Sequence, residues 1–231
     1  MEMHRYPLGI AERFRITWLL DAIFVHQLNM EMHMNKIGLT DGDALLIVDV
    51  QNDFLPGGKL AVPTGDEVIP VLNRYIDLFS KRNLPTYATR DWHPSDNCSF
   101  TPQGGIWPSH CVANSAGAEF PSALHLPDTA IVVSKATTSQ KDAYSGFEGT
   151  DLAAQLESRG IKRLFIGGLA TDYCVLNTVR DALSHGFKVA LMVDAIRAVN
   201  LRAGDGQAAI DEMIERGAVP LHFSNTTEKP Q

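Results

Sequence analysis

The sequence is poor in cysteine and contains no long apolar run. Three cysteines stand among 231 residues, a small and odd number that favours reduced thiols in the cytoplasm over a disulfide framework. No apolar stretch approaches the roughly 20 residues that a membrane-spanning helix needs. No block of basic residues stands out, and the net charge of −7 argues against a surface for nucleic acid or an anionic membrane.

The first 39 residues differ from the rest of the chain. Residues 13–25 resemble an amphipathic helix or a signal peptide, but Asp21 interrupts their apolar run. Met30, Met32 and Met34 precede the first expected strand, so translation starting at one of them is an alternative to a native N-terminal helix. We therefore expect residues 1–39 to be an N-terminal extension of open status and residues 40–231 to form one domain.

From residue 43 onward, short apolar runs alternate with stretches of helical periodicity. The apolar runs predict strands at 44–48, 85–89, 130–134, 163–166, 188–193 and 219–223. The periodic stretches predict helices at 66–81, 152–159, 172–185 and 205–216. Repeated βα units of this kind imply an α/β fold, a doubly wound, Rossmann-like sheet of six mainly parallel strands with helices on both faces.

Four polar side chains stand where predicted strands end. Asp49, Asp91, Lys135 and Cys174 each lie at or just beyond the carboxyl end of a strand. Ligands bind outside that edge of an open α/β sheet, so the fold would bring these four residues to one rim.

Three of these residues suit acyl transfer. A thiolate at Cys174 can attack a carbonyl carbon, while Asp49 removes the thiol proton and later donates it to the leaving group. The ammonium of Lys135 and a helix N-terminus at Cys174 would lower the pKa of the thiol. Taken singly, each has an ordinary alternative: a turn-forming aspartate, an exposed lysine at a strand end, and a small buried cysteine. Their joint placement favours the catalytic interpretation.

A second cluster suits a metal ion. Asp91 and His93 are two residues apart, and His110 lies further along the same long loop region. An oxygen–nitrogen–nitrogen set accepts Zn²⁺, Fe²⁺ or Mn²⁺ and leaves positions open for substrate or water. Alone, Asp-x-His is a weak signal. Cys98 and Cys111 lack CxxC spacing and are interpreted as free thiols.

Seven segments together resemble the nicotinamidases, the nicotinamide and pyrazinamide deamidases among the isochorismatase-like cysteine hydrolases. The segments are Asp49–Phe54, the Pro-Gly-Gly at 56–58, Asp91–Pro94, Trp107–Val112, Ser134–Lys135, Asp142–Phe147 and Gly168–Cys174. They occur in the family's order within residues 43–223, so the resemblance implies an isochorismatase-like hydrolase domain over residues 40–231.

The resemblance implies roles for individual residues. Cys174 would be the nucleophile, Asp49 the acid/base and Lys135 the third catalytic residue. Asp91, His93 and His110 would hold one divalent metal ion (Zn, Fe or Mn), with the pyridine nitrogen of the substrate facing it.

The resemblance also implies how a substrate would be held. A cis peptide between Leu169 and Ala170 would aim the N–H groups of Ala170 and Cys174 at an oxyanion. Phe54, Trp107 and Tyr144 would line the substrate pocket, whereas without the family each of these aromatic residues would be interpreted as core.

The sequence departs from the family at Asn97, where many nicotinamidases have a further metal-binding histidine. An amide oxygen is a weaker ligand for these ions than imidazole. We therefore expect either weaker metal binding, or that Asp96 or a water completes the shell.

The favoured function is hydrolysis of nicotinamide to nicotinate and ammonia through a thioester, in NAD salvage, with pyrazinamide as a further substrate. One alternative is a cysteine amidohydrolase for a carbamoyl or ureido substrate, which needs no metal to face a pyridine. Another is a catalytically silent scaffold, which would be expected to lack Cys174, Asp49 or Lys135. The sequence leaves a homo-oligomer open.

Overall fold

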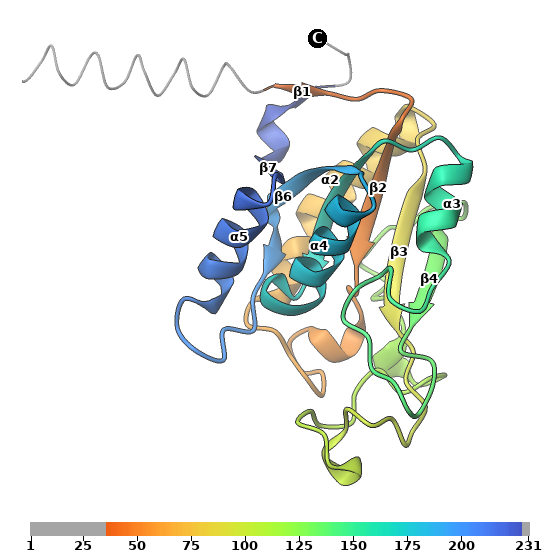
Figure 1. The fold of residues 1–231 in the computed structure, drawn as a ribbon, viewed down its shortest axis with the longest axis vertical. Helices are drawn as coiled ribbons and strands as arrows, with labels where there is room; N and C mark the ends of the chain where they lie inside the picture. Colours follow the sequence, from red (N-terminus) through yellow and green to blue (C-terminus); the bar gives the residue numbers. More distant parts are fainter. Residues whose placement is uncertain (1–35, 228–231) are drawn as a thin grey trace, which may run out of the picture.

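The computed structural model describes residues 36–227, and six of its strands form one parallel sheet in the order β4-β3-β2-β5-β6-β7 (Figure 1). The strands are β2 (Asp43–Val48), β3 (Thr86–Asp91), β4 (Ile131–Lys135), β5 (Arg163–Leu169), β6 (Lys188–Arg197) and β7 (Val219–Leu221). Each adjacent pair is parallel, which confirms the predicted fold class. A separate pair joins β1 (Ile37–Gly38) to β8 (Thr226–Thr227).

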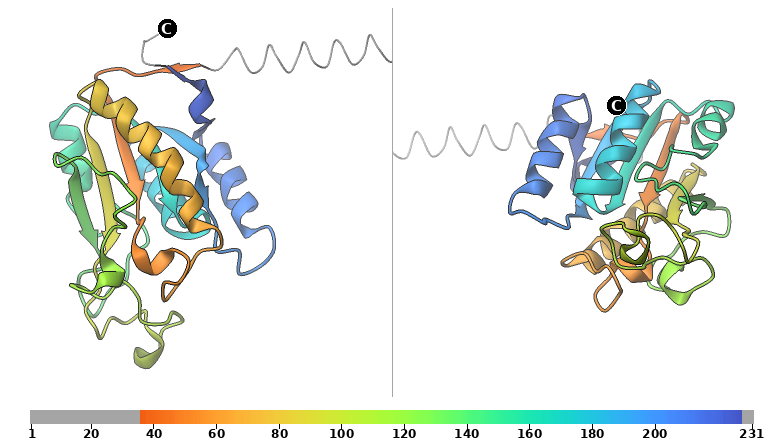
Figure 2. Two further views of the ribbon diagram at one scale, coloured as in Figure 1. Left: turned by 180° about the vertical axis from the view of Figure 1, so that it is seen from behind. Right: turned by 60° about the horizontal axis from the view of Figure 1, so that its bottom comes forward.

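Helices cover both faces of the sheet. Helix α2 (Val68–Lys81) lies on one face, and α3 (Leu152–Ser158), α4 (Leu176–Ser184) and α5 (Asp205–Glu215) lie on the other (Figure 2). Each face has its own cluster of buried apolar side chains. The doubly wound arrangement follows, because right-handed crossovers on either side of β2 place helices on opposite faces.

The central strand β2 shows why these residues form a buried sheet. All six of its residues are buried, and its apolar run lacks the polar alternation of a strand with one face in water. On α2, the buried residues Val68, Leu72, Tyr75 and Phe79 recur at helical spacing and face the sheet.

The topological switch point lies between β2 and β5. From β2 the chain first adds β3 and β4 on one side, then returns to add β5, β6 and β7 on the other. The carboxyl ends of the strands meet at the lower end of the sheet in Figure 1, beside the segments 49–64 and 92–130. Because Asp49 follows β2 and Cys174 closely follows β5, the switch point places these two residues at one crevice.

Close contact between β2 and β5 depends on a glycine. Gly168 has φ +125°, and a Cβ atom there would overlap the backbone of Val48, its register partner. The register between β5 and β6 shifts between Ile166 and Gly168. Only glycine readily adopts this conformation at so short a backbone distance.

Most of the predicted N-terminal extension lies outside the described residues, so its boundary at residue 39 stays a prediction. In the part of the chain from 36 to 227, no helix combines the length and apolarity that crossing a membrane requires.

Candidate active site

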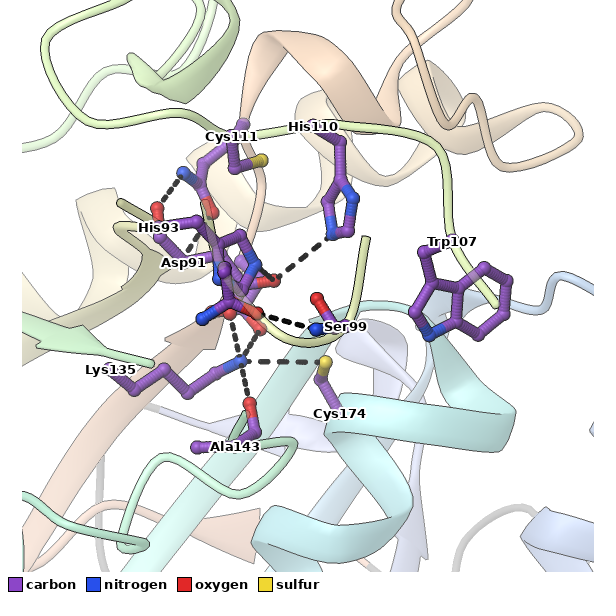
Figure 3. Close-up of polar contacts among 12 residues, drawn as sticks. Asp91, His93, Ser99, Trp107, His110, Cys111, Lys135, Ala143 and Cys174 are labelled. Carbon is purple, nitrogen blue, oxygen red and sulfur yellow. Dashed lines mark hydrogen bonds and ion pairs between the residues drawn. The ribbon is translucent and has the colours of Figure 1, made fainter. Parts of the chain in front are cut away.

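The buried ammonium of Lys135 lies at the centre of the site (Figure 3). Its Nζ atom is 2.9 Å from Asp49 Oδ2 and 3.6 Å from Cys174 Sγ. It also donates hydrogen bonds to Asp91 Oδ1 and, at 2.9 Å, to the carbonyl oxygen of Ala143. The structure thus brings together the three residues that the sequence proposes as a triad, and it joins them to the first residue of the proposed metal set.

Strand register accounts for this convergence. Asp91 and Lys135 are direct partners at the ends of β3 and β4. Asp49 and Ala136, each just beyond a strand end, have φ values of 50° and 52°. Non-glycine residues in this left-handed region cost about 1–3 kcal/mol each and cluster at functional sites. The backbone therefore turns sharply where the polar side chains must face the crevice.

The charges in this cluster balance one another. Burial alone would lower the pKa of Lys135, yet Asp49 and Asp91 raise the pKa well above its usual value, so the amine stays charged. Burial would raise the pKa of Asp91, but Lys135 and the neighbouring histidines hold that pKa below its usual range. The pKa of Asp49 is raised, mainly by burial and against the pull of Lys135. Asp49 is the carboxylate better suited to take up a proton.

The protonation state of Cys174 differs from the sequence-based expectation. Burial raises the pKa of its thiol well above the usual value; Lys135 opposes this shift, and the carboxylates of Asp49 and Asp91 add to it. A π-helical turn, η5 (Thr171–Val175), leads directly into α4, so Cys174 lies in the first turn of the helical segment predicted at 172–185. Burial thus outweighs the acidifying effect expected from Lys135 and the helix N-terminus, and the thiol needs a base.

One partner of Asp49 was missed in the sequence. Thr89 is fully buried on β3, and its hydroxyl donates a 2.6 Å hydrogen bond to Asp49 Oδ1. This bond fixes one carboxylate oxygen and leaves Oδ2 facing Lys135. The pairing of Val48 with Thr89 explains the contact, but strand pairing is not visible in sequence periodicity.

Asp91, His93 and His110 form a compact buried group. One potential ligand atom from each residue lies within 4.8 Å of the others. The Nε2 atoms of His93 and His110 are 3.5 and 3.9 Å from Asp91 Oδ2. Ligand atoms about 2 Å from a zinc ion lie roughly 3–3.5 Å apart, so the group needs little adjustment to hold such an ion.

The hydrogen bonding of the two histidines also fits a metal. Within residues 36–227, both ring nitrogens of His93 are buried without a hydrogen bond, and Nε2 has only the longer contact with Asp91. A buried polar group left unbound in this way costs about 1–3 kcal/mol. His110 Nδ1 lies 2.8 Å from the carbonyl oxygen of Pro108, which leaves Nε2 free to face Asp91. Burial lowers the pKa of His110, which favours the neutral imidazole that a metal requires. The donor set therefore fits one divalent cation.

Asn97 has a different role from the one expected. Its buried side-chain amide donates to the carbonyl oxygens of Thr138 and Lys141 and accepts from the N–H of Ser99. Asp96 is exposed and accepts a hydrogen bond from Ser139. Asp96 is not part of the metal group, and the amide of Asn97 is bound to backbone groups instead. Weaker metal binding and a water in the remaining position both stay predictions.

We expect Asn97→Ala to lower the free energy of unfolding by about 1–3 kcal/mol, because buried backbone groups lose their partners. Zinc retained per folded molecule after dialysis should stay the same, as measured by urea unfolding and metal analysis. Asp96→Ala is the matched control and should change neither quantity. Zinc loss from Asn97→Ala at unchanged stability would restore Asn97 as a ligand.

Aromatic side chains form one wall of a pocket that opens onto Cys174. The Phe54 ring is 5.5 Å from that of His110, measured between centroids. The indole N–H of Trp107 donates to the hydroxyl of Tyr144 at 3.0 Å, and the Trp107 ring meets Tyr173 edge-on. The three aromatic residues implied by the family resemblance therefore line the same pocket, and Tyr173 joins them.

Several pocket residues carry no clear signal in the sequence. They are Leu60, Val62 and Val199, whereas Asp142 and Tyr173 lie within segments that resemble the family but have no role assigned from the sequence. Tyr173 lies next to Cys174, so its position offered a clue. The others come from loops without periodicity, and Val199 is held by a hydrogen bond from its N–H to Asp172.

The backbone at Ala170 has the geometry that the resemblance implies. The peptide bond between Leu169 and Ala170 is cis. Ala170 is extended and directly precedes η5, which carries Cys174. The N–H groups of these two residues remain the proposed oxyanion donors.

Comparison with known proteins identifies the family of this chain. Residues 43–223 match the model of the Isochorismatase domain. A nicotinamidase of Escherichia coli is 41% identical over 196 residues, covering 76% of this chain and 92% of that protein.

Two solved structures share the fold. The pyrazinamidase of Pyrococcus horikoshii, solved in complex with zinc, is 49% identical with a TM-score of 0.76, covering 79% of this chain and 99% of that one. PnC1 from L. infantum, solved in complex with nicotinate, is 37% identical with a TM-score of 0.77, covering 83% and 98% of the two chains. The chain is a member of the isochorismatase domain family.

Proposed function

We propose that this protein is a nicotinamidase: it hydrolyses nicotinamide to nicotinate and ammonia through a cysteine thioester, and it also deamidates pyrazinamide. The observation that carries the proposal is the set of contacts made by Lys135. One ammonium bridges Asp49, Cys174 and Asp91, so a nucleophile, a base and a metal-binding carboxylate share one centre. Nicotinate is a precursor for NAD salvage.

The pocket suits a flat heteroaromatic amide. Phe54, Trp107 and Tyr144 present apolar ring surfaces, which stack on or meet the edge of an aromatic ring. One zinc, iron or manganese ion held by Asp91, His93 and His110 would supply a Lewis-acid position for the ring nitrogen. The carboxamide would then lie toward Cys174.

The residues of the triad perform the proton transfers. Asp49 Oδ2 accepts the Cys174 proton as the sulfur attacks the amide carbon, and the N–H groups of Ala170 and Cys174 bind the oxyanion. Asp49 then returns the proton to the leaving nitrogen, which departs as ammonia. Asp49 then deprotonates a water that attacks the thioester, and it passes this proton to the departing sulfur, which restores the free thiol and the carboxylate. Nicotinic acid leaves and ionises to nicotinate in solvent. Throughout, Lys135 holds the carboxylate and balances its charge.

The cellular setting follows from the thiols and the site. Cys98, Cys111 and Cys174 are all free, which supports a reducing compartment and a cytoplasmic enzyme. The partner that the site requires is a small molecule.

The test is ammonia release from nicotinamide, pyrazinamide and an N-carbamoyl amino acid, each before and after metal removal by a chelator. We expect turnover of the two aromatic amides, a fall of roughly tenfold or more without metal, and recovery when zinc, iron or manganese is returned. Turnover of the carbamoyl compound alone, unaffected by the chelator, would instead establish the competing amidohydrolase.

A further inference from the structure

Three consecutive side chains form hydrogen bonds with the backbone of the loop that carries His110. The side-chain amide of Gln51 donates to the carbonyl oxygen of Ala118 at 2.9 Å. That of Asn52 donates to the carbonyl oxygen of Ala116 at 2.8 Å. The carboxylate of Asp53 accepts from the N–H of Cys111 at 2.7 Å. Neither the catalytic steps nor the pocket described above uses these three side chains.

Gln51 also holds the backbone of Asp91 from one side. Its Nε2 donates to the Asp91 carbonyl oxygen at 2.7 Å, and its Oε1 accepts from the Asp91 N–H at 2.8 Å. The pairing of β2 with β3 stops at Val48 and Thr89, so the amide of Gln51 replaces the next step of the ladder. On the other side, Asp91 pairs with Lys135. Its backbone is thus fixed from both directions.

Asp53 holds the backbone next to His110, another proposed metal ligand. Its buried carboxylate bonds the N–H of Cys111, which directly follows His110 and has φ +45°. A left-handed conformation at a residue with a side chain needs external support. Gly117 packs so closely on this carboxylate that a Cβ atom there would overlap it. The turn that places His110 beside Asp91 is therefore stabilised by Asp53, which belongs to the segment that begins at Asp49.

We infer that Gln51 and Asp53 are positioning residues for the metal centre: Gln51 sets the direction of Asp91, and Asp53 sets that of His110. The inference rests on the metal site of the proposed function. Partners that orient metal ligands typically change metal affinity by about 10- to 100-fold. Asn52 holds the same loop without touching a ligand or its neighbour, so it is the internal control.

The experiment measures Co²⁺ binding to the metal-free full-length protein and the visible spectrum of the cobalt-loaded form. Gln51→Met and Asp53→Ala should weaken binding by about 10- to 100-fold and change the cobalt bands, which report ligand geometry. Asn52→Ala should bind as the wild type does. Asp53→Asn should largely restore affinity, because an amide oxygen can accept the Cys111 hydrogen bond. If Gln51→Met does not fold, Gln51→Glu replaces it in the test. A glutamate has about the same size but cannot donate the two hydrogen bonds to the carbonyl oxygens of Asp91 and Ala118.

Thermal unfolding of each metal-free variant separates positioning from general stability. A purely structural role would lower the unfolding temperature while leaving the Co²⁺ affinity and spectrum of the folded protein unchanged, and that result would overturn the inference. A wild type that binds no Co²⁺ would instead count against the metal site of the proposed function.

Discussion

Replacing Cys174 with alanine is expected to abolish ammonia release from nicotinamide, with a loss in kcat of roughly 10⁴-fold or more. The sulfur is the atom that forms the thioester, and no neighbouring group can substitute for it. Cys111 is buried with its sulfur 4.0 Å from the carbonyl oxygen of Gly117, and Cys98 is exposed. Steady-state ammonia release and a test for a burst of product provide the measurement.

Cys98→Ala is the matched control, because it removes a thiol outside the cluster and should leave turnover intact. Cys174→Ala should retain its fold and metal, since the side chain is small and is not one of the three proposed ligands, Asp91, His93 and His110. Measurable turnover by Cys174→Ala above the uncatalysed rate would rule out the covalent route.

Asp49→Asn is expected to lower kcat by roughly 10³- to 10⁴-fold, because an amide cannot accept and return the proton. The effect should be large because the Cys174 thiol is held neutral by burial and depends on a base at the moment of attack. Asparagine tolerates the left-handed backbone of this position, φ +50°, better than most residues. The fold should therefore survive, and circular dichroism with zinc analysis would check it.

Thr89→Val gives the control for Asp49. It removes the hydroxyl that bonds Asp49 Oδ1 but leaves the carboxylate and its contact with Lys135. We expect a loss in kcat of about tenfold or less, consistent with a single hydrogen bond. Equal losses from both substitutions would mean that the orientation of the carboxylate, rather than its proton transfer, limits the rate.

The sequence is enough to predict which residues lie at the edge of the sheet that forms the site, because its pattern of apolar and polar residues marks the strand ends. The apolar run before Asp49 and the polar residues after it mark a strand end, and the same holds for Lys135. In a parallel sheet all such ends lie at one edge. Register then decides which of them touch, and it sets Asp91 against Lys135. Register depends on pairing across the sheet, so these contacts follow from the fold and not from any one segment.

Other features of the site could not be predicted because they depend on loops. Asn97 occupies a ligand position in the family pattern, yet its amide supports the backbone of Thr138 and Lys141. Burial raises the pKa of the Cys174 thiol, and the pattern that marks a helix start does not report burial. Gln51 resembles an ordinary polar residue until its three backbone partners are known.

Lys135 belongs to β4, the terminal strand of the six-stranded sheet, which has five residues and a single neighbour, β3. Outer strands of this kind open at lower free energy than the interior of a sheet. If β4 separated from β3, Lys135 would leave the site and activity would be lost. Asp49 and Cys174, on either side of the switch point, would stay in place. Loss of activity by local unfolding would therefore begin at an outer strand of the sheet and not at its central strands.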